Sequence, residues 1–127
     1  MQDVTLILIV DDERPFAELM RAVLSPHYSC VIASSVTEAL KQLNTRTFDL
    51  VLVDKELSDG SGLVLLPFLR ATAPRTVAIM MSEKTDEQSL AEAHEMGASE
   101  FIRKPINLIH LCEVVESAIA YKASNAA

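Results

Sequence analysis

Several features common in enzymes and membrane proteins are scarce or missing in this 127-residue chain. It has three glycines and contains neither G-x-G-x-x-G nor a Walker A sequence, so nucleotide binding has no support. No run reaches the roughly 18 apolar residues of a membrane span, and we expect no membrane insertion. Met1, Gln2 and Asp3 lack the basic residues and apolar stretch that open a secretory signal.

Metal-ligating and redox-active side chains are also few. Cys30 and Cys112 lie far apart and form no C-x-x-C motif, so we expect reduced core cysteines in a cytoplasmic protein. The histidines at 27, 94 and 110 show no ligand spacing. These patterns argue against a zinc site and a disulfide framework.

The chain has fewer basic residues than acidic ones. Lys and Arg number 11 against 18 Asp and Glu, which leaves a net charge of −7. A nucleic-acid-binding surface requires a face rich in Lys and Arg, so we expect no direct nucleic-acid contact from this chain. The charge is compatible with a metal cation or with a partner that carries a basic patch, and it also favours solubility.

The hydrophobic residues, half of the chain, fall into a regular alternation of two patterns. Short apolar runs predict buried strands at residues 6–10, 29–33, 48–53, 76–81 and 99–103. Segments of helical periodicity follow each run, at about 15–24, 36–43, 63–71, 86–96 and 108–119. Five β-α units with short connections predict one α/β domain, a parallel sheet covered by helices on both faces.

Local sequence also predicts how some helices begin and end. Thr85 or Asp86 is expected to cap the fourth helix, Gly97 to follow its last turn, and Asn107 to cap the fifth. Pro67 lies inside the third predicted helix, so we expect a kink or a late start there. The fourth helix has few large apolar side chains, and a poorly anchored helix is a candidate for movement.

Five polar residues follow the ends of predicted strands. Asp11 and Asp12 come after the first run, Asp54 after the third, Ser82 after the fourth and Lys104 after the fifth. The carboxyl ends of parallel strands open onto one edge of the sheet, where ligands bind. The topology therefore predicts one crevice with three carboxylates, a hydroxyl and an ammonium.

That combination suits a divalent metal and a phosphoryl group. Oxygen ligands suit Mg²⁺, and a carboxylate such as Asp54 can attack phosphorus to give an acyl phosphate. Two carboxylates about 4 Å apart repel by roughly 4 kcal/mol at an effective dielectric constant near 20, so cationic groups must offset them. Taken singly, each residue has an ordinary alternative role: a helix cap for Asp11 or Asp12, a turn for Asp54 and Ser82, and an exposed surface position for Lys104.

In their order and placement these residues resemble the receiver domain of two-component response regulators. The resemblance covers residues of about 4 to 122. The matching motifs are Ile-Val-Asp-Asp-Glu at 9–13, Leu-Val-Asp at 52–54, Asp-Gly-Ser-Gly at 59–62, Ser82, Gly-Ala at 97–98 and Phe-Ile-Arg-Lys-Pro at 101–105.

The resemblance implies a flavodoxin-like, doubly wound sheet of five parallel strands in the order 2-1-3-4-5, with five helices, and one receiver domain over residues 1–127. It implies a signalling switch in which Asp54 accepts a phosphoryl group from a histidine kinase or a phosphotransfer protein. Such a domain catalyses only its own phosphorylation and dephosphorylation and is not a turnover enzyme.

The resemblance also assigns the metal site. Asp12, Asp54 and the backbone carbonyl of Glu56 would hold Mg²⁺, with Asp11 nearby through water. These assignments agree with the physical expectation that phosphoryl transfer depends mainly on positioning and charge neutralisation.

The remaining positions form the implied switch. Ser82 and Lys104 would bind the phosphoryl oxygens, and Phe101 matches an aromatic position that rotates inward as Ser82 moves toward the phosphate. This movement would reshape the surface of the fourth helix, fifth strand and fifth helix, which could also serve a homodimer.

Some residues depart from the family pattern. Position 101 is Phe, which lacks the hydroxyl of the Tyr often found there, and Glu83 places a carboxylate at the mouth of the site, where it could hinder a phosphate donor. Glu56 and Lys84 lie two residues beyond Asp54 and Ser82. We hypothesise that Glu56 and Lys84 pair across the mouth and limit access of water; the alternative is two unpaired surface charges.

Parts of the sequence are compatible with two other functions. A degenerate receiver would act as an unphosphorylated protein-interaction module; the complete Asp, Ser and Lys set argues against it, whereas Glu83 favours it slightly. A magnesium-dependent phosphatase with an Asp nucleophile usually carries a second Asp two residues later, where this chain has Glu56. A target protein or output domain is expected, and since none fits in 127 residues, the chain is either a stand-alone receiver or the amino-terminal receiver of a longer regulator.

Overall fold

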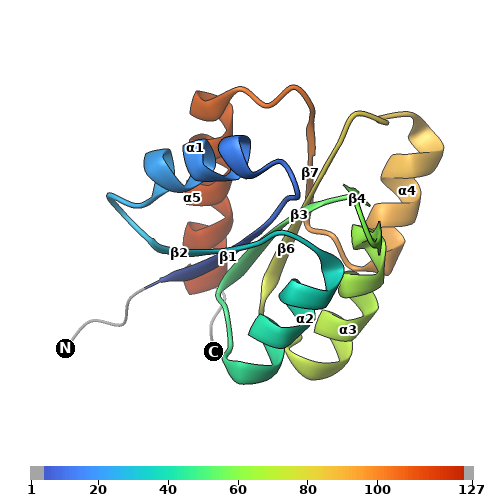
Figure 1. Ribbon diagram of the computed structural model, residues 1–127, viewed down its shortest axis with the longest axis horizontal. Helices are drawn as coiled ribbons and strands as arrows, with labels where there is room; N and C mark the ends of the chain where they lie inside the picture. Colours follow the sequence, from blue (N-terminus) through green and yellow to red (C-terminus); the bar gives the residue numbers. More distant parts are fainter. Residues whose placement is uncertain (1–4, 125–127) are drawn as a thin grey trace.

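The computed structural model describes residues 5–124, which form a five-stranded parallel sheet between two layers of helices (Figure 1). The strands are ordered β2-β1-β3-β6-β7, which is the predicted 2-1-3-4-5 order. They cover β1 (Leu6–Val10), β2 (Ser29–Ala33), β3 (Leu50–Asp54), β6 (Val77–Ser82) and β7 (Glu100–Arg103). The predicted α/β fold is therefore confirmed.

Helices cover both faces of the sheet. Helices α1 (Arg14–Leu24) and α5 (Leu108–Ser124) lie on one face, and α2 (Val36–Thr45), α3 (Leu65–Thr72) and α4 (Glu87–Met96) lie on the other (Figure 1). Alternate side chains of β1 point to opposite faces of the sheet. Ile7 packs with α1 and α5, and Leu8 packs with the helices of the other layer. The strands are apolar on both faces because both faces are buried.

Most predicted helix ends are confirmed. The Asp86 side chain caps α4 by accepting a hydrogen bond from Ser89 N (2.7 Å), and Asn107 caps α5 through Ile109 N (2.9 Å). Gly97 follows α4 with a φ of 117°. A glycine adopts this left-handed conformation without the steric penalty of a Cβ atom.

The region after β3 differs from the prediction. A two-stranded antiparallel hairpin, β4 (Glu56–Leu57) and β5 (Gly60–Ser61), is followed by a 3₁₀ turn, η1 (Gly62–Val64), before α3 begins at Leu65. The helix expected at about 63–71 begins at Leu65, so of the two outcomes expected from Pro67 the late start is confirmed; Pro67 lies in the first turn, where no intrahelical N–H is required.

The ends of the chain limit two other expectations. The predicted polar tail begins at Ala123, but α5 extends through Ser124, and residues 125–127 lie outside the described part. Residue 4, the predicted start of the domain core, also lies outside it. Within residues 5–124, no helix has the length and apolar character needed to cross a membrane.

Candidate functional site

Lys104, at the end of β7, reaches across the carboxyl edge of the sheet to three acidic residues. Its Nζ lies 2.6 Å from Asp54 Oδ2 at the end of β3, and 3.6 Å from both Asp11 Oδ2 and Glu13 Oε1 after β1. The sheet order places β3 between β1 and β6, with β7 beyond, so a long side chain from β7 is needed to span the site. The predicted convergence of Asp11, Asp54 and Lys104 is therefore present.

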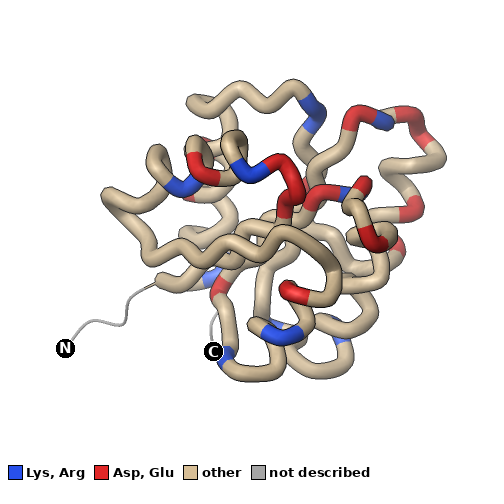
Figure 2. Tube along the Cα trace, in the orientation of Figure 1, with Lys and Arg blue, Asp and Glu red and all other residues tan. Residues whose placement is uncertain are grey.

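The acidic residues form a compact group. Each of Asp11, Asp12 and Asp54 offers one carboxylate oxygen within 4.8 Å of the others. Asp11 and Asp54 are buried, whereas Asp12 is exposed. Acidic positions also gather more widely where β1 and β3 end (Figure 2).

Burial makes this charge costly. Desolvation raises the pKa of Asp11 and of Asp54 above the ordinary value, although Lys104 opposes the shift in both. Burial alone would lower the pKa of Lys104, but its hydrogen bond to Asp54 and the charge of Asp11 raise it overall. One ammonium thus faces several carboxylates, and the site retains excess negative charge.

The Asp11 carboxylate also has an unused ligand position. Its Oδ1 accepts a hydrogen bond from Glu13 N at 2.9 Å, but its buried Oδ2 has no hydrogen-bond partner. A buried oxygen without a partner is costly unless an ion or water satisfies it. Lys104 Nζ faces this oxygen only at 3.6 Å, so three clustered carboxylates with an oxygen that accepts no hydrogen bond are a donor set that fits a hard, oxygen-preferring cation such as Mg²⁺.

Ser82, at the end of β6, is buried beside this group and has an unexpected partner. Its Oγ donates to the Glu56 carboxylate, with distances of 3.1 and 3.3 Å to the two oxygens, and accepts a hydrogen bond from Lys84 N at 3.0 Å. The hypothesised ion pair between Glu56 and Lys84 is absent from the described residues. Glu56 binds the serine hydroxyl in place of the lysine ammonium.

The β4–β5 hairpin is anchored at both ends. Asp59 accepts hydrogen bonds from Val36 N (2.8 Å) and Thr37 N (3.1 Å) at the start of α2. At the other end, a Cβ atom on Gly62 would lie 2.2 Å from the backbone oxygen of Asp54, so only glycine fits there. Both residues belong to the Asp-Gly-Ser-Gly motif, and their roles are to fix the loop that follows Asp54.

Phe101 in β7 is half-buried and packs against the apolar layer of α2, α3 and α4. Glu83 is exposed, as expected for a residue at the mouth. Sequence reasoning missed the contact of Glu13 with Lys104, although Glu13 belongs to the motif at 9–13. The peptide bond between Lys104 and Pro105 is cis.

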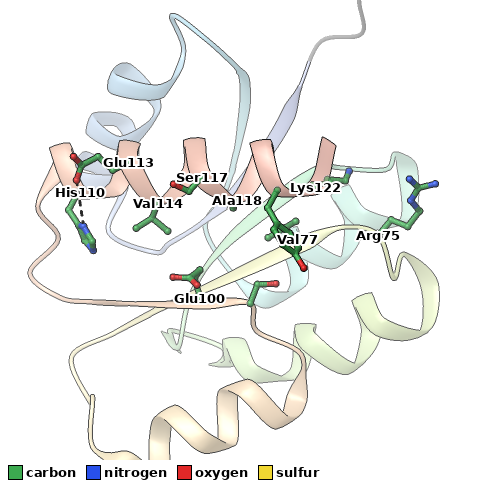
Figure 3. A pocket seen from close by; sticks show the side chains of 11 residues that line it. Arg75, Val77, Glu100, His110, Glu113, Val114, Ser117, Ala118 and Lys122 are labelled. Atoms are coloured by element: carbon green, nitrogen blue, oxygen red, sulfur yellow. Dashed lines mark ion pairs between the residues drawn. The ribbon is translucent and has the colours of Figure 1, made fainter. Parts of the chain in front are cut away.

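A separate groove of about 800 Å³ runs along α5 from His110 to Lys122 and past the amino-terminal ends of β6 and β7 (Figure 3). An ion pair between His110 Nδ1 and Glu113 Oε1 (3.9 Å) lies at one end of it. None of the acidic or strand-end residues of the candidate site lines this groove.

Comparison with known proteins identifies the family. The family model for the response regulator receiver domain matches residues 7–116. This chain belongs to that family. The receiver is 35% identical over 113 residues to the response regulator protein PilR of Pseudomonas aeruginosa, covering 88% of this chain and 25% of PilR. It is 30% identical over 116 residues to the transcriptional regulatory protein ZraR of Escherichia coli O157:H7, covering 91% of this chain and 26% of ZraR.

Solved structures agree with this assignment. A CheY-like response regulator receiver domain protein from Methanospirillum hungatei aligns with a TM-score of 0.92 and 26% identity, over 98% of this chain and all of that chain. The receiver domain of NtrX from Brucella abortus aligns with a TM-score of 0.82 and 31% identity, over 90% and 98% of the two chains. The receiver spans about a quarter of the length of PilR and ZraR.

Proposed function

We propose that the receiver is a phosphorylation-dependent signalling switch and that Asp54 is its phosphoacceptor. The observation that carries the proposal is the 2.6 Å contact between Lys104 Nζ and Asp54 Oδ2 in a buried acidic pocket. A buried carboxylate paired with one ammonium and flanked by other carboxylates matches the needs of phosphoryl transfer, which are positioning and charge neutralisation.

The donor is proposed to be a phosphohistidine on a sensor kinase or phosphotransfer protein. One oxygen of Asp54 forms a bond to phosphorus as the phosphorus–nitrogen bond breaks, and the imidazole nitrogen keeps the electron pair and takes up a proton. Lys104 Nζ already lies against the carboxylate and would neutralise charge on the transferred group. Water attack on the acyl phosphate then returns Asp54 and inorganic phosphate, so the domain acts on itself without turning over a separate substrate.

Asp11, Asp12, Asp54 and the backbone carbonyl of Glu56 are the residues proposed to hold Mg²⁺. The clustered carboxylates, and the buried Asp11 Oδ2 that accepts no hydrogen bond, support this assignment. The ion would supply charge neutralisation for the entering phosphoryl group.

Ser82 and Phe101 are proposed to relay the change. Ser82 would donate its hydroxyl proton to a phosphoryl oxygen, and Phe101 would move inward against α4, altering the surface formed by α4, β7 and α5. That surface would contact an output domain, a target protein or a second receiver in the cytoplasm. We propose that residues 1–127 constitute this single switch domain.

A degenerate receiver is the second candidate, because the Ser82 hydroxyl is already bonded to Glu56 and Glu83 adds charge at the mouth. Such a module would bind its partner without phosphorylation. The two candidates differ in whether Asp54 reacts.

The deciding experiment treats the protein with acetyl phosphate and MgCl₂ and measures intact mass and amide chemical shifts. We expect one hydroxylamine-labile phosphoryl group per chain and shifts concentrated between residues 82 and 104. Asp54→Asn should show neither, whereas Glu116→Gln, which changes an exposed acidic residue of α5 outside the site, should react like the wild type. An unreactive wild type under acetyl phosphate, and also under beryllofluoride, would favour the degenerate receiver.

A further inference from the structure

The Ser82 hydroxyl can donate one hydrogen bond, and in this structure it donates that bond to the Glu56 carboxylate. Ser82 Oγ lies 3.1 and 3.3 Å from the two carboxylate oxygens of Glu56, and it accepts a hydrogen bond from Lys84 N. A serine hydroxyl is a single donor. While this hydrogen bond persists, Ser82 has no proton for a phosphoryl oxygen at Asp54.

Glu56 is held in this position by its backbone. It pairs with Ser61 across the β4–β5 hairpin, and its N–H donates to Asp54 Oδ1 at 3.1 Å. The far end of the hairpin is tied to α2 through Asp59, and Gly62 packs against the Asp54 carbonyl. The loop that follows the phosphoacceptor therefore presents an exposed carboxylate to a buried hydroxyl, with little freedom in the connecting backbone.

We propose that Glu56 is a positioning residue that retains Ser82 in the unphosphorylated arrangement. The inference rests on the proposed function of Asp54. A phosphoryl group on Asp54 carries negative charge and competes with the Glu56 carboxylate for the same hydroxyl proton. Activation accordingly requires the hydrogen bond between Glu56 and Ser82 to break, so Glu56 sets how readily the phosphorylated arrangement forms.

The test uses beryllofluoride with MgCl₂ as the probe, titrated into the full chain and followed by amide chemical shifts. Glu56→Ala removes the competing acceptor, so we expect the affinity for beryllofluoride to rise about tenfold, the scale of one hydrogen bond to a charged group. Glu56→Gln keeps an acceptor oxygen without the charge, so its affinity for beryllofluoride should lie between those of the wild type and Glu56→Ala. Glu116→Ala removes an exposed carboxylate of α5 outside the site, and should change the affinity less than twofold.

A double-mutant cycle with Ser82→Ala separates positioning from simple charge repulsion. If Glu56 acts through Ser82, Glu56→Ala should lose its advantage in the Ser82→Ala background. An equal gain in both backgrounds would mean that Glu56 only repels the anion and would overturn the inference. No gain from Glu56→Ala in the Ser82 background would overturn it as well.

The protein without beryllofluoride gives a second measurement. Three-bond couplings of Ser82 should report one χ1 rotamer in the wild type and averaging among rotamers in Glu56→Ala, whereas unchanged couplings would contradict the proposal. Thermal unfolding midpoints close to the wild type would exclude misfolding as the cause. If the folded wild type binds no beryllofluoride, the proposed function fails and the inference falls with it; if it binds and Glu56→Ala changes nothing, only the inference fails.

Discussion

At the scale of single residues, the site consists of charges that the fold keeps in an unfavourable environment. Asp11 and Asp54 are buried together, and Lys104 alone neutralises them by direct contact among the described side chains. The opposite situation occurs at Asp59, an exposed carboxylate that receives hydrogen bonds from two backbone N–H groups of α2. Buried carboxylates therefore form the candidate site, and an exposed carboxylate fixes the loop.

The Asp59 hydrogen bonds predict a pH dependence of stability. Hydrogen bonds from Val36 N and Thr37 N lower the pKa of Asp59 below 3.8. A depressed folded pKa stabilises the fold above the unfolded pKa, and this contribution is lost as pH falls through the folded value. In urea unfolding between pH 6 and pH 3, we expect the difference between the wild type and Asp59→Asn to shrink toward acid pH.

Glu83→Gln provides the control for this comparison, because Glu83 is exposed and accepts no hydrogen bond from the start of α2. Only Asp59→Asn removes a carboxylate that accepts hydrogen bonds from α2, so its stability difference from the wild type should change more with pH than that of Glu83→Gln. A difference for Asp59→Asn that grew toward low pH would contradict the assignment of Asp59 as a charged cap.

The convergence of the charged side chains could be predicted from the sequence because strand ends in a parallel sheet share one edge. Asp11, Asp54 and Lys104 needed only the correct topology to meet. The partner of Glu56 could not be predicted, because Lys84 and Ser82 lie two residues apart and side-chain geometry alone decides between them. Opposite charge favoured Lys84, and the geometry of the hairpin selected the hydroxyl.

At the scale of elements, α4 is only weakly anchored in its layer. It buries Ala93 alone among its described residues, as α2 buries Ala39 alone, whereas α3 buries three leucines. The Arg70 side chain of α3 donates to the Glu95 carbonyl at 2.6 Å, near the carboxyl end of α4. A hydrogen bond from Arg70 therefore holds the carboxyl end of α4, where apolar packing is sparse.

This hydrogen bond predicts a local effect of Arg70→Ala. Loss of one charged hydrogen bond should raise amide exchange rates at the end of α4, including Gly97, by about tenfold. The amides of α2 should exchange at the wild-type rate. Arg75→Ala, in the same region of sequence but without a contact to α4, is the matched control, and equal effects of the two substitutions would rule out a specific role for Arg70.

Elements with strong local patterns were predicted, and elements without them were not. The cap of α4 by Asp86 and the end at Gly97 follow from side-chain chemistry confined to a few residues. The β4–β5 hairpin has strands of two residues each, too short to show any periodicity, so the pattern of apolar residues could not predict it. The apolar spacing at 63–71 also could not separate the 3₁₀ turn from α3.

At the scale of the whole molecule, a net charge of −7 is concentrated in part at the carboxyl edge of the sheet (Figure 2). A cation that binds the native acidic group and not the unfolded chain must stabilise the fold by mass action. Binding of Mg²⁺ should therefore raise the free energy of unfolding whether or not Asp54 is phosphorylated.

We predict that MgCl₂ raises the free energy of unfolding of the wild type by about 1.4 kcal/mol at a free concentration ten times the dissociation constant. Asp11→Asn should abolish this increase. Without the metal it should be more stable than the wild type, because burial raises the pKa of Asp11 and so disfavours its charged form. The measurement is urea unfolding in MgCl₂, with NaCl at matched ionic strength as the control. An equal increase in NaCl would mean that general screening of charge, and not binding of Mg²⁺, stabilises the protein.

The contact between Lys104 and Asp54 joins parts of the chain that are made at different times during synthesis. A nascent polypeptide exposes its acidic cluster long before the ribosome has released the strand that supplies the ammonium. A product truncated before β7 would carry the carboxylates without their counter-charge. If Asp54 is the phosphoacceptor, competence to accept a phosphoryl group should therefore arrive only with the last strand.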